Sequence, residues 1–246
     1  MAGDYEKISH DIETRLVSAA SEAFAEDLAS VILYGSAARG MYRRGVSDVN
    51  ILILLEKSSP RKIFRFGRTA ARLIRRLKVT PLIMSRIEFD SSADVFPMEY
   101  HDIRDSHKIL FGKNDISVPV PNRTNLRHQM EERLRGAVND LRQMLSAAAG
   151  RERVLGAFLK GWSGAPNALF RGLVRLKASE APPADPEELL SRVSREYGID
   201  TLAFSELNLL RKGEKRSPLL VAEALLEALK AFAAVVDAMP ADGGSA

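Results

Sequence analysis

The sequence predicts an α+β fold in the first half of the chain and an all-helical domain in the second half. Short apolar runs alternate with amphipathic segments up to about residue 111, which is typical of strands packed against helices. From residue 124 onward only long helical periods follow. A linker with two prolines, residues 114–121, separates the two patterns. We therefore predict an α+β domain at 1–118, a helical bundle domain at 119–239 and a disordered tail at 240–246.

The first domain is expected to contain a mixed sheet with flanking helices. Ile8, Ile12 and Leu16 lie at helical spacing and predict an amphipathic helix over residues 5–28. Apolar runs bounded by glycine or polar residues predict four strands, at residues 30–34, 48–55, 79–84 and 107–111. Pro81 lacks an N–H group for a central ladder, so it favours an edge position or a bulge for the third strand. Residues 36–45 are expected to form a loop or a short helix.

A strongly basic segment follows the second predicted strand. Residues 61–78 contain eight lysine and arginine residues and no acid. Five of them step by four and three along one side of a helix, and apolar residues follow another side. The arginine side is open to two interpretations, a phosphate-contacting surface or a solvated outer face. The second is preferred. Phe64 and Phe66 lie in the first turns and Phe66 belongs to the apolar side, so they make no base-stacking platform along the arginine side, and we do not expect nucleic acid as a partner.

The second domain is expected to consist of five helices. They are predicted at residues 124–146, 151–177, 186–197, 202–210 and 218–239. Asp185 precedes Pro186, and this pair is typical of a capped helix start. Trp162 is expected to pack inside the domain. The Arg123 and His128 spacing loosely fits helical ribonucleases, and chance explains it better.

The composition excludes several kinds of site. The chain has no cysteine, which excludes disulfides, thiol catalysis and cysteine-ligated metals. Its four histidines form no His-x-x-x-His pair, so a histidine-rich metal site is not expected. No run reaches the ~18 apolar residues of a membrane span, and the first residues lack the apolar core of a signal peptide. We expect a cytoplasmic protein without a membrane partner.

One group of residues, between the first and second predicted strands, is a candidate functional site. The predicted strand at 30–34 ends at Gly35 and Ser36, where a turn can approach a ligand closely and donate to phosphate oxygens. After a gap of eleven residues a second strand begins, and its period of two places Asp48 and Asn50 on one face. One carboxylate and one amide are therefore predicted to converge beside a phosphate-binding turn.

This pattern resembles the nucleotidyltransferase superfamily, which includes DNA polymerase beta, kanamycin nucleotidyltransferase and the minimal MNT-type proteins. The family motif is Gly-Ser or Gly-Gly at a strand end, a gap of about nine to thirteen residues, and Asp-apolar-Asp/Glu-apolar. Gly35-Ser36, the gap and Asp48-Val49 match this motif, whereas Asn50 stands where the family has its second carboxylate. The motif covers about residues 30–56, and the α+β domain followed by helices is also similar to this family.

The resemblance implies transfer of a nucleoside monophosphate from a nucleoside triphosphate to a hydroxyl of a small molecule or protein, with the help of Mg²⁺. It implies that Gly35 and Ser36 contact phosphates and that Asp48 is the catalytic residue and a magnesium ligand. Arg39 lies in the same loop and would offset phosphate charge. Asn50 would contact the nucleotide and offer an uncharged oxygen to the metal. A homodimer is left open.

The third acid of the family motif has no counterpart in this sequence. Thr80 or Leu82 stands where it is expected. Four acids could fold back to replace it: Glu88, Asp90, Glu99 and Asp102. The polar stretch 99–107 is interpreted as a solvated helix turn before the fourth strand rather than a metal site. Because two of the three carboxylates are absent, the alternative hypothesis is a catalytically degenerate protein that binds a nucleotide or a partner.

Overall fold

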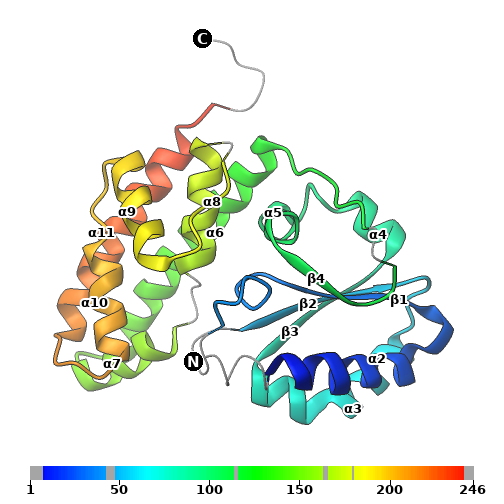
Figure 1. Cartoon of the computed structure of the whole chain (residues 1–246). Helices are drawn as coiled ribbons and strands as arrows, with labels where there is room; N and C mark the ends of the chain where they lie inside the picture. The colour runs from blue at the N-terminus through cyan, green and yellow to red at the C-terminus, as the bar shows by residue number, and fades with distance from the viewer. Residues whose placement is uncertain (1–7, 43–47, 114–115, 163–165, 179, 241–246) are drawn as a thin grey trace. The chain divides into compact units, whose positions relative to one another are not determined.

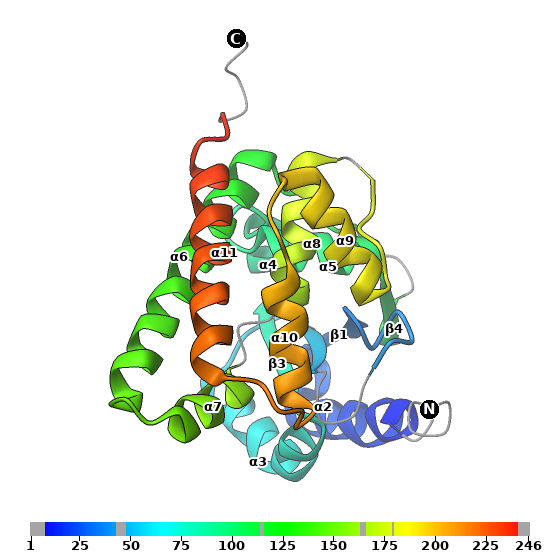
Figure 2. The ribbon, with the colours of Figure 1, turned by 90° about the vertical axis from the view of Figure 1, so that its left-hand side faces the viewer.

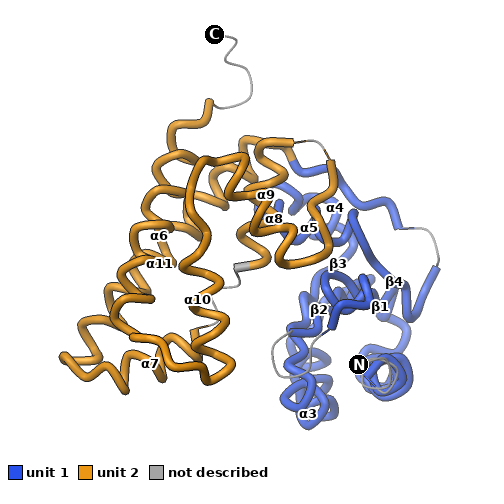
Figure 3. The backbone as a smooth tube through the Cα atoms, turned by 60° about the vertical axis from the view of Figure 1, so that its left-hand side comes forward, with its two compact units in different colours: residues 1–121 blue, residues 122–246 orange. Residues whose placement is uncertain are grey.

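The computed structural model describes residues 8–42, 48–113, 116–162, 166–178 and 180–240. The chain separates into two compact units, residues 1–121 and residues 122–246 (Figure 3). Parts of the predicted first helix (residues 5–7), of the predicted loop (43–45) and of the predicted tail (241–246) lie outside the described residues.

The first unit is built on a four-stranded mixed sheet with the order β3-β2-β1-β4. The strands are β1 (Leu28–Tyr34), β2 (Val49–Leu55), β3 (Val79–Ser85) and β4 (His107–Phe111). β1 pairs antiparallel with β2 and with β4, whereas β2 and β3 are parallel. Parallel neighbours need a crossover connection, and helix α3 (Pro60–Leu77) supplies it. β3 is an edge strand, which confirms the position predicted from Pro81.

Helices cover both faces of this sheet. α2 (Val17–Phe24) and α3 lie on one face, and α4 (Arg86–Ser91) and α5 (Pro97–Asp105) lie on the other (Figure 1). Alternate residues of β2 serve the two faces: Val49 and Ile51 join the core under α2 and α3, whereas Leu52 joins the core under α4 and α5. Asn50 shares the face of Leu52, so its amide points to the α4 and α5 side.

The first helix ends earlier than predicted. In the described residues it runs from Ile8 to Phe24 and includes a π-helical stretch, η1 (Ile12–Leu16). Ala25 then adopts a positive φ of 51°, and a 3₁₀ turn, η2 (Ala25–Asp27), leads into β1. A positive φ in a residue with a Cβ cannot continue a right-handed helix. The helix predicted to residue 28 was therefore too long, and β1 starts two residues before its predicted start.

In its described residues, the second unit consists of helices. They are α6 (Arg123–Ala148), α7 (Glu152–Gly161), α8 (Pro166–Lys177), α9 (Pro186–Tyr197), α10 (Leu202–Arg211) and α11 (Pro218–Asp237). α11 packs along α6 and α10 (Figure 2). Edge-to-face contacts join Phe170 to Phe204 and to Phe232 in its core. Trp162 is 6% exposed, as its predicted packing role requires.

The single helix predicted over residues 151–177 was wrong, because α7 and α8 are separate. α7 ends at Gly161, and Trp162 has an extended backbone with ψ of 114°. Glycine weakens the helix at this point, and a proline at residue 166 starts a helix more readily than it continues one. In the described part of the chain, no helix is both long and apolar enough to cross a membrane.

Candidate functional site

A tight turn follows β1, at the place where the sequence predicted a loop or a short helix. Residues 35–40 form consecutive turns. The N–H of Arg39 donates to the Gly35 carbonyl at 3.2 Å, and the N–H of Met41 donates to the Ser36 carbonyl at 2.9 Å. Gly35 is buried and has a φ of +75°, a conformation that glycine adopts without a steric penalty. The chain thus coils tightly at the end of a buried strand, and Ser36 remains half-exposed.

The turn and the start of β2 are in direct contact. Tyr34 pairs with Asn50 in the antiparallel register of β1 and β2. A Cβ atom placed on Gly35 would lie 2.9 Å from the side-chain nitrogen of Asn50. Asp48 directly precedes β2 and is exposed. The structure therefore brings Gly35 and Asn50 together and leaves Asp48 two residues away at the same end of β2.

The neighbouring strand offers no carboxylate. In the parallel register of β2 and β3, Asn50 pairs with Thr80 and Leu52 pairs with Leu82. Thr80, one of the two residues that stand where the family has its third acid, is exposed. Within the residues that the structure describes, no three histidine or acidic side chains are grouped so that they could hold a metal ion.

Two acids of α5 face the end of β1. A carboxylate oxygen of Asp102 lies 3.8 Å from the guanidinium of Arg39, and these side chains are only 17% and 15% exposed. Burial raises the pKa of the Tyr34 hydroxyl above its ordinary value, and the charges of Glu99 and Asp102 raise it further. Four acids were named as possible replacements for the third acid of the family motif. Of these, Glu99 and Asp102 interact with residues at the end of β1.

The spacing of Glu99 and Asp102 in the sequence is a signal for this pair. Glu99 and Asp102 are three residues apart, so a helix places them on one face. The solvated helix turn predicted for residues 99–107 is instead the half-buried helix α5, and β4 begins two residues after its end. His107 is held at the junction, because its Nδ1 lies 2.8 Å from the Ile103 carbonyl oxygen. Asp102 positions Arg39, a role that spacing along the chain alone does not reveal.

The geometry supports anion binding more directly than metal binding. Arg39 supplies a positive charge beside the turn, and Ser36 supplies a hydroxyl and an N–H group. Asp48 and Asn50 supply one carboxylate and one amide oxygen. Arg123, which with His128 loosely fits the spacing of helical ribonucleases, has a structural role. It donates to the Leu176 carbonyl at 3.1 Å and so anchors α6 to α8.

Comparison with known proteins finds one family match, which lies within the first unit. Residues 14–110 match the family model described as "Nucleotidyltransferase domain". This range contains the turn, β2, β3, α5 and most of β4. No curated protein matches the chain.

A solved structure has a similar fold over most of the chain. The spectinomycin adenyltransferase AAD(9) from Enterococcus faecialis, solved with ATP and spectinomycin, aligns with a TM-score of 0.50 and 10% sequence identity. The alignment covers 89% of this chain and 98% of that protein. At this identity the likeness concerns the fold, and it confirms the predicted class of a mixed sheet with flanking helices followed by a helical region.

Proposed function

Because residues 14–110 form a domain of the nucleotidyltransferase superfamily, we propose that the protein transfers a nucleoside monophosphate from a nucleoside triphosphate to a hydroxyl group. In this reaction the acceptor oxygen attacks the α-phosphorus, the bond between the α- and β-phosphates breaks, and pyrophosphate leaves. One observation carries the proposal: the turn at Gly35 lies against Asn50 at the start of β2. Phosphate-binding groups and candidate metal ligands therefore come from adjacent strand ends.

The turn would bind and orient the triphosphate. Phosphoryl transfer depends mainly on positioning and on stabilisation of negative charge. Ser36 would donate to phosphate oxygens, and the glycine at residue 35 would let the backbone approach them closely. Arg39 would offset phosphate charge, and its ion pair with Asp102 would hold the guanidinium in place before the nucleotide arrives.

Asp48 and Asn50 fit a magnesium ion that arrives with the triphosphate. Mg²⁺ commonly binds one or two protein carboxylates and completes its shell with substrate phosphates and water. The exposed carboxylate of Asp48 and the amide oxygen of Asn50 are donors of this kind. When bound, the ion would neutralise charge on the phosphates. A site made of three protein acids is not found in the described residues.

A small molecule is the acceptor class that we favour, with a protein hydroxyl as the second choice. The structure with a similar fold was solved with ATP and an antibiotic, spectinomycin. ATP is accordingly the first donor to test. We also propose that the protein works in the cytoplasm, where nucleoside triphosphates are abundant.

Transfer can be tested with triphosphates labelled at the α-phosphate. The protein is incubated with each labelled triphosphate, Mg²⁺ or Mn²⁺, and a panel of small hydroxyl compounds and proteins. We expect label on an acceptor and its loss in the Asp48→Ala variant. Asp140→Ala removes an exposed acid of α6 and serves as the matched control. Absence of transfer from the folded protein in every combination would reject the proposal.

The second candidate function is a nucleotide- or partner-binding module without turnover. It is favoured by one observation: Asn50 has an amide where the family has a carboxylate, and its partner on β3, Thr80, has no carboxylate either. Calorimetry with ATP separates the two functions. A module should bind ATP with little dependence on Mg²⁺, whereas tight binding that requires both Mg²⁺ and Asp48 would favour the transferase.

A further inference from the structure

Helix α3 exposes a row of arginines that the fold does not use. Its exposed face carries Arg61, Arg68, Arg72 and Arg75, which step along one side of the helix. Within the described part of the chain, these four guanidinium groups have no ion pair or hydrogen bond. The two aromatics of this helix differ from each other: Phe66 is buried, whereas Phe64 lies in the same outward-facing part of the helix as the arginines and is 78% exposed, which reopens the stacking role that the sequence did not favour. We call the four arginines and Phe64 the α3 arginine face.

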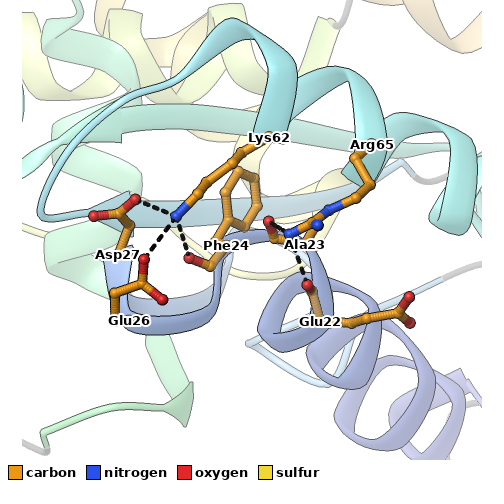
Figure 4. A network of polar contacts seen from close by, with 7 residues as sticks. All are labelled: Glu22, Ala23, Phe24, Glu26, Asp27, Lys62 and Arg65. Carbon is orange, nitrogen blue, oxygen red and sulfur yellow. Dashed lines mark hydrogen bonds and ion pairs between the residues drawn. The ribbon is translucent and has the colours of Figure 1, made fainter.

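Other cations of α3 are occupied by the fold. Lys62 donates to Asp27 at 2.5 Å and to the Phe24 carbonyl at 3.2 Å (Figure 4). Arg65 donates to the Glu22 and Ala23 carbonyls, so both side chains cap the C-terminal end of α2 (Figure 4). Arg76 pairs with Asp11 of the first helix.

The contrast between the two sets of cations suggests a function for the second set. Lys62, Arg65 and Arg76 attach α3 to the rest of the first unit. Arg68, Arg72 and Arg75 repel one another at spacings of three and four residues, which destabilises a helix. Arg75 lies in the last turn of α3, where a positive charge is favourable, but Arg68 and Arg72 bring the fold no such gain in the absence of an anionic ligand.

We propose that the α3 arginine face binds single-stranded nucleic acid. Arginine binds phosphate in a bidentate manner and remains charged at all relevant pH values. Arg61 and Arg75 are fourteen residues apart, which at ~1.5 Å per residue gives about 21 Å of phosphate-binding surface. Phe64 supplies an exposed ring on which a base can stack.

The chemistry of the face distinguishes a nucleic acid from a membrane. A helix that lies in a membrane surface turns its apolar side outward. In α3 the apolar side chains are buried against the sheet, among them Phe66, Ala70 and Leu73. Phe64 alone cannot replace such a side. This surface is independent of the proposed nucleotidyl transfer, since none of its residues belongs to the candidate site.

Fluorescence anisotropy with labelled single-stranded RNA and DNA of roughly 12 nucleotides tests the proposal. Four phosphate contacts predict a slope of about −3 for log K against log salt. Replacement of Arg61, Arg68, Arg72 and Arg75 by Gln should weaken binding at least tenfold and flatten this slope. Phe64→Ala should weaken binding and leave the slope unchanged.

The matched control removes four exposed cations of the second unit, by changing Arg142, Arg153, Arg195 and Lys215 to Gln. Both fourfold variants lower the net charge from +4 to 0. Thermal melting checks folding, and Arg68→Gln with Arg72→Gln is the milder variant if the fourfold change prevents folding. Equal loss of binding in the control, or binding to phosphatidylserine vesicles without binding to the oligonucleotides, would overturn the proposal.

Discussion

Gly35 allows the turn after β1 to lie directly against the Asn50 side chain of β2, which a residue with a Cβ atom would prevent. Its φ of +75° disfavours other residues, and its missing Cβ leaves room for the Asn50 amide. We predict that Gly35→Ala lowers the free energy of unfolding by about 1–3 kcal/mol, from strain together with the clash. Urea denaturation measures this loss.

Gly40 provides the matched control for this change. It has nearly the same φ, +72°, and nothing lies within 4 Å of the position of an added Cβ. Gly40→Ala should therefore show the backbone strain alone and cost less than Gly35→Ala. Equal costs for the two variants would show that the contact with Asn50 contributes nothing.

In the proposed site, Asn50 is the residue that we expect to limit metal binding most. A second carboxylate beside Asp48 would add one negative charge to the site. At about 4 Å and an effective dielectric of about 20, a pair of unit charges is worth about 4 kcal/mol before desolvation. We predict that Asn50→Asp tightens the binding of Mg²⁺ with ATP by at least tenfold, as measured by calorimetry. Asn50→Ala, which adds no charge, should not tighten it, and a similar gain in both variants would contradict the prediction.

At the scale of elements, the prediction from sequence succeeded where an element has its own local signal. The strands β2 and β4 and the helices α3 and α9 were predicted within one residue of their observed bounds. The helix α4 was missed, and α5 was predicted only as a solvated helix turn at residues 99–107. α4 begins with a capping box between Ser85 and Glu88, a signal that is readable in the sequence.

The candidate site was predictable only in part, for a physical reason. Gly35, Ser36 and Asp48 belong to a motif with fixed spacing, so local rules identify them. The approach of Asp102 to Arg39 depends instead on how α5 packs across the sheet. Tertiary packing of this kind leaves no spacing rule in the sequence. The carboxylate at residue 102 could be proposed as one of four acids and could not be selected among them.

The N-cap of α9, Asp185, is expected to contribute to the stability of the helical unit. Asp185 accepts hydrogen bonds from the N–H groups of Glu187 and Glu188, both at 3.0 Å. We predict that Asp185→Ala lowers the free energy of unfolding by about 1 kcal/mol, because two N–H groups lose their acceptor. Asp185→Asn keeps a capping oxygen and should lose much less. Urea denaturation measures both, and equal losses would contradict the capping role.

At the scale of the whole molecule, each of the two units has a hydrophobic core of its own residues. The core under α2 and α3 and the core under α4 and α5 use residues of the first unit only. The aromatic contacts of Phe170, Phe204 and Phe232 lie entirely in the second unit. A compact unit with its own core can fold alone. The division at residues 121 and 122 therefore leads to a prediction about fragments.

We predict that residues 1–121 and residues 122–246, expressed separately, each unfold cooperatively. Circular dichroism should show mixed helix and strand signals for the first fragment and a predominantly helical signal for the second, because the strands all lie in the first unit. Thermal melting of each fragment measures its cooperativity. The first fragment contains Gly35, Asp48 and Asn50, so calorimetry can ask whether it binds ATP without the helical unit. A fragment that melts without a cooperative transition would show that its core depends on the other unit.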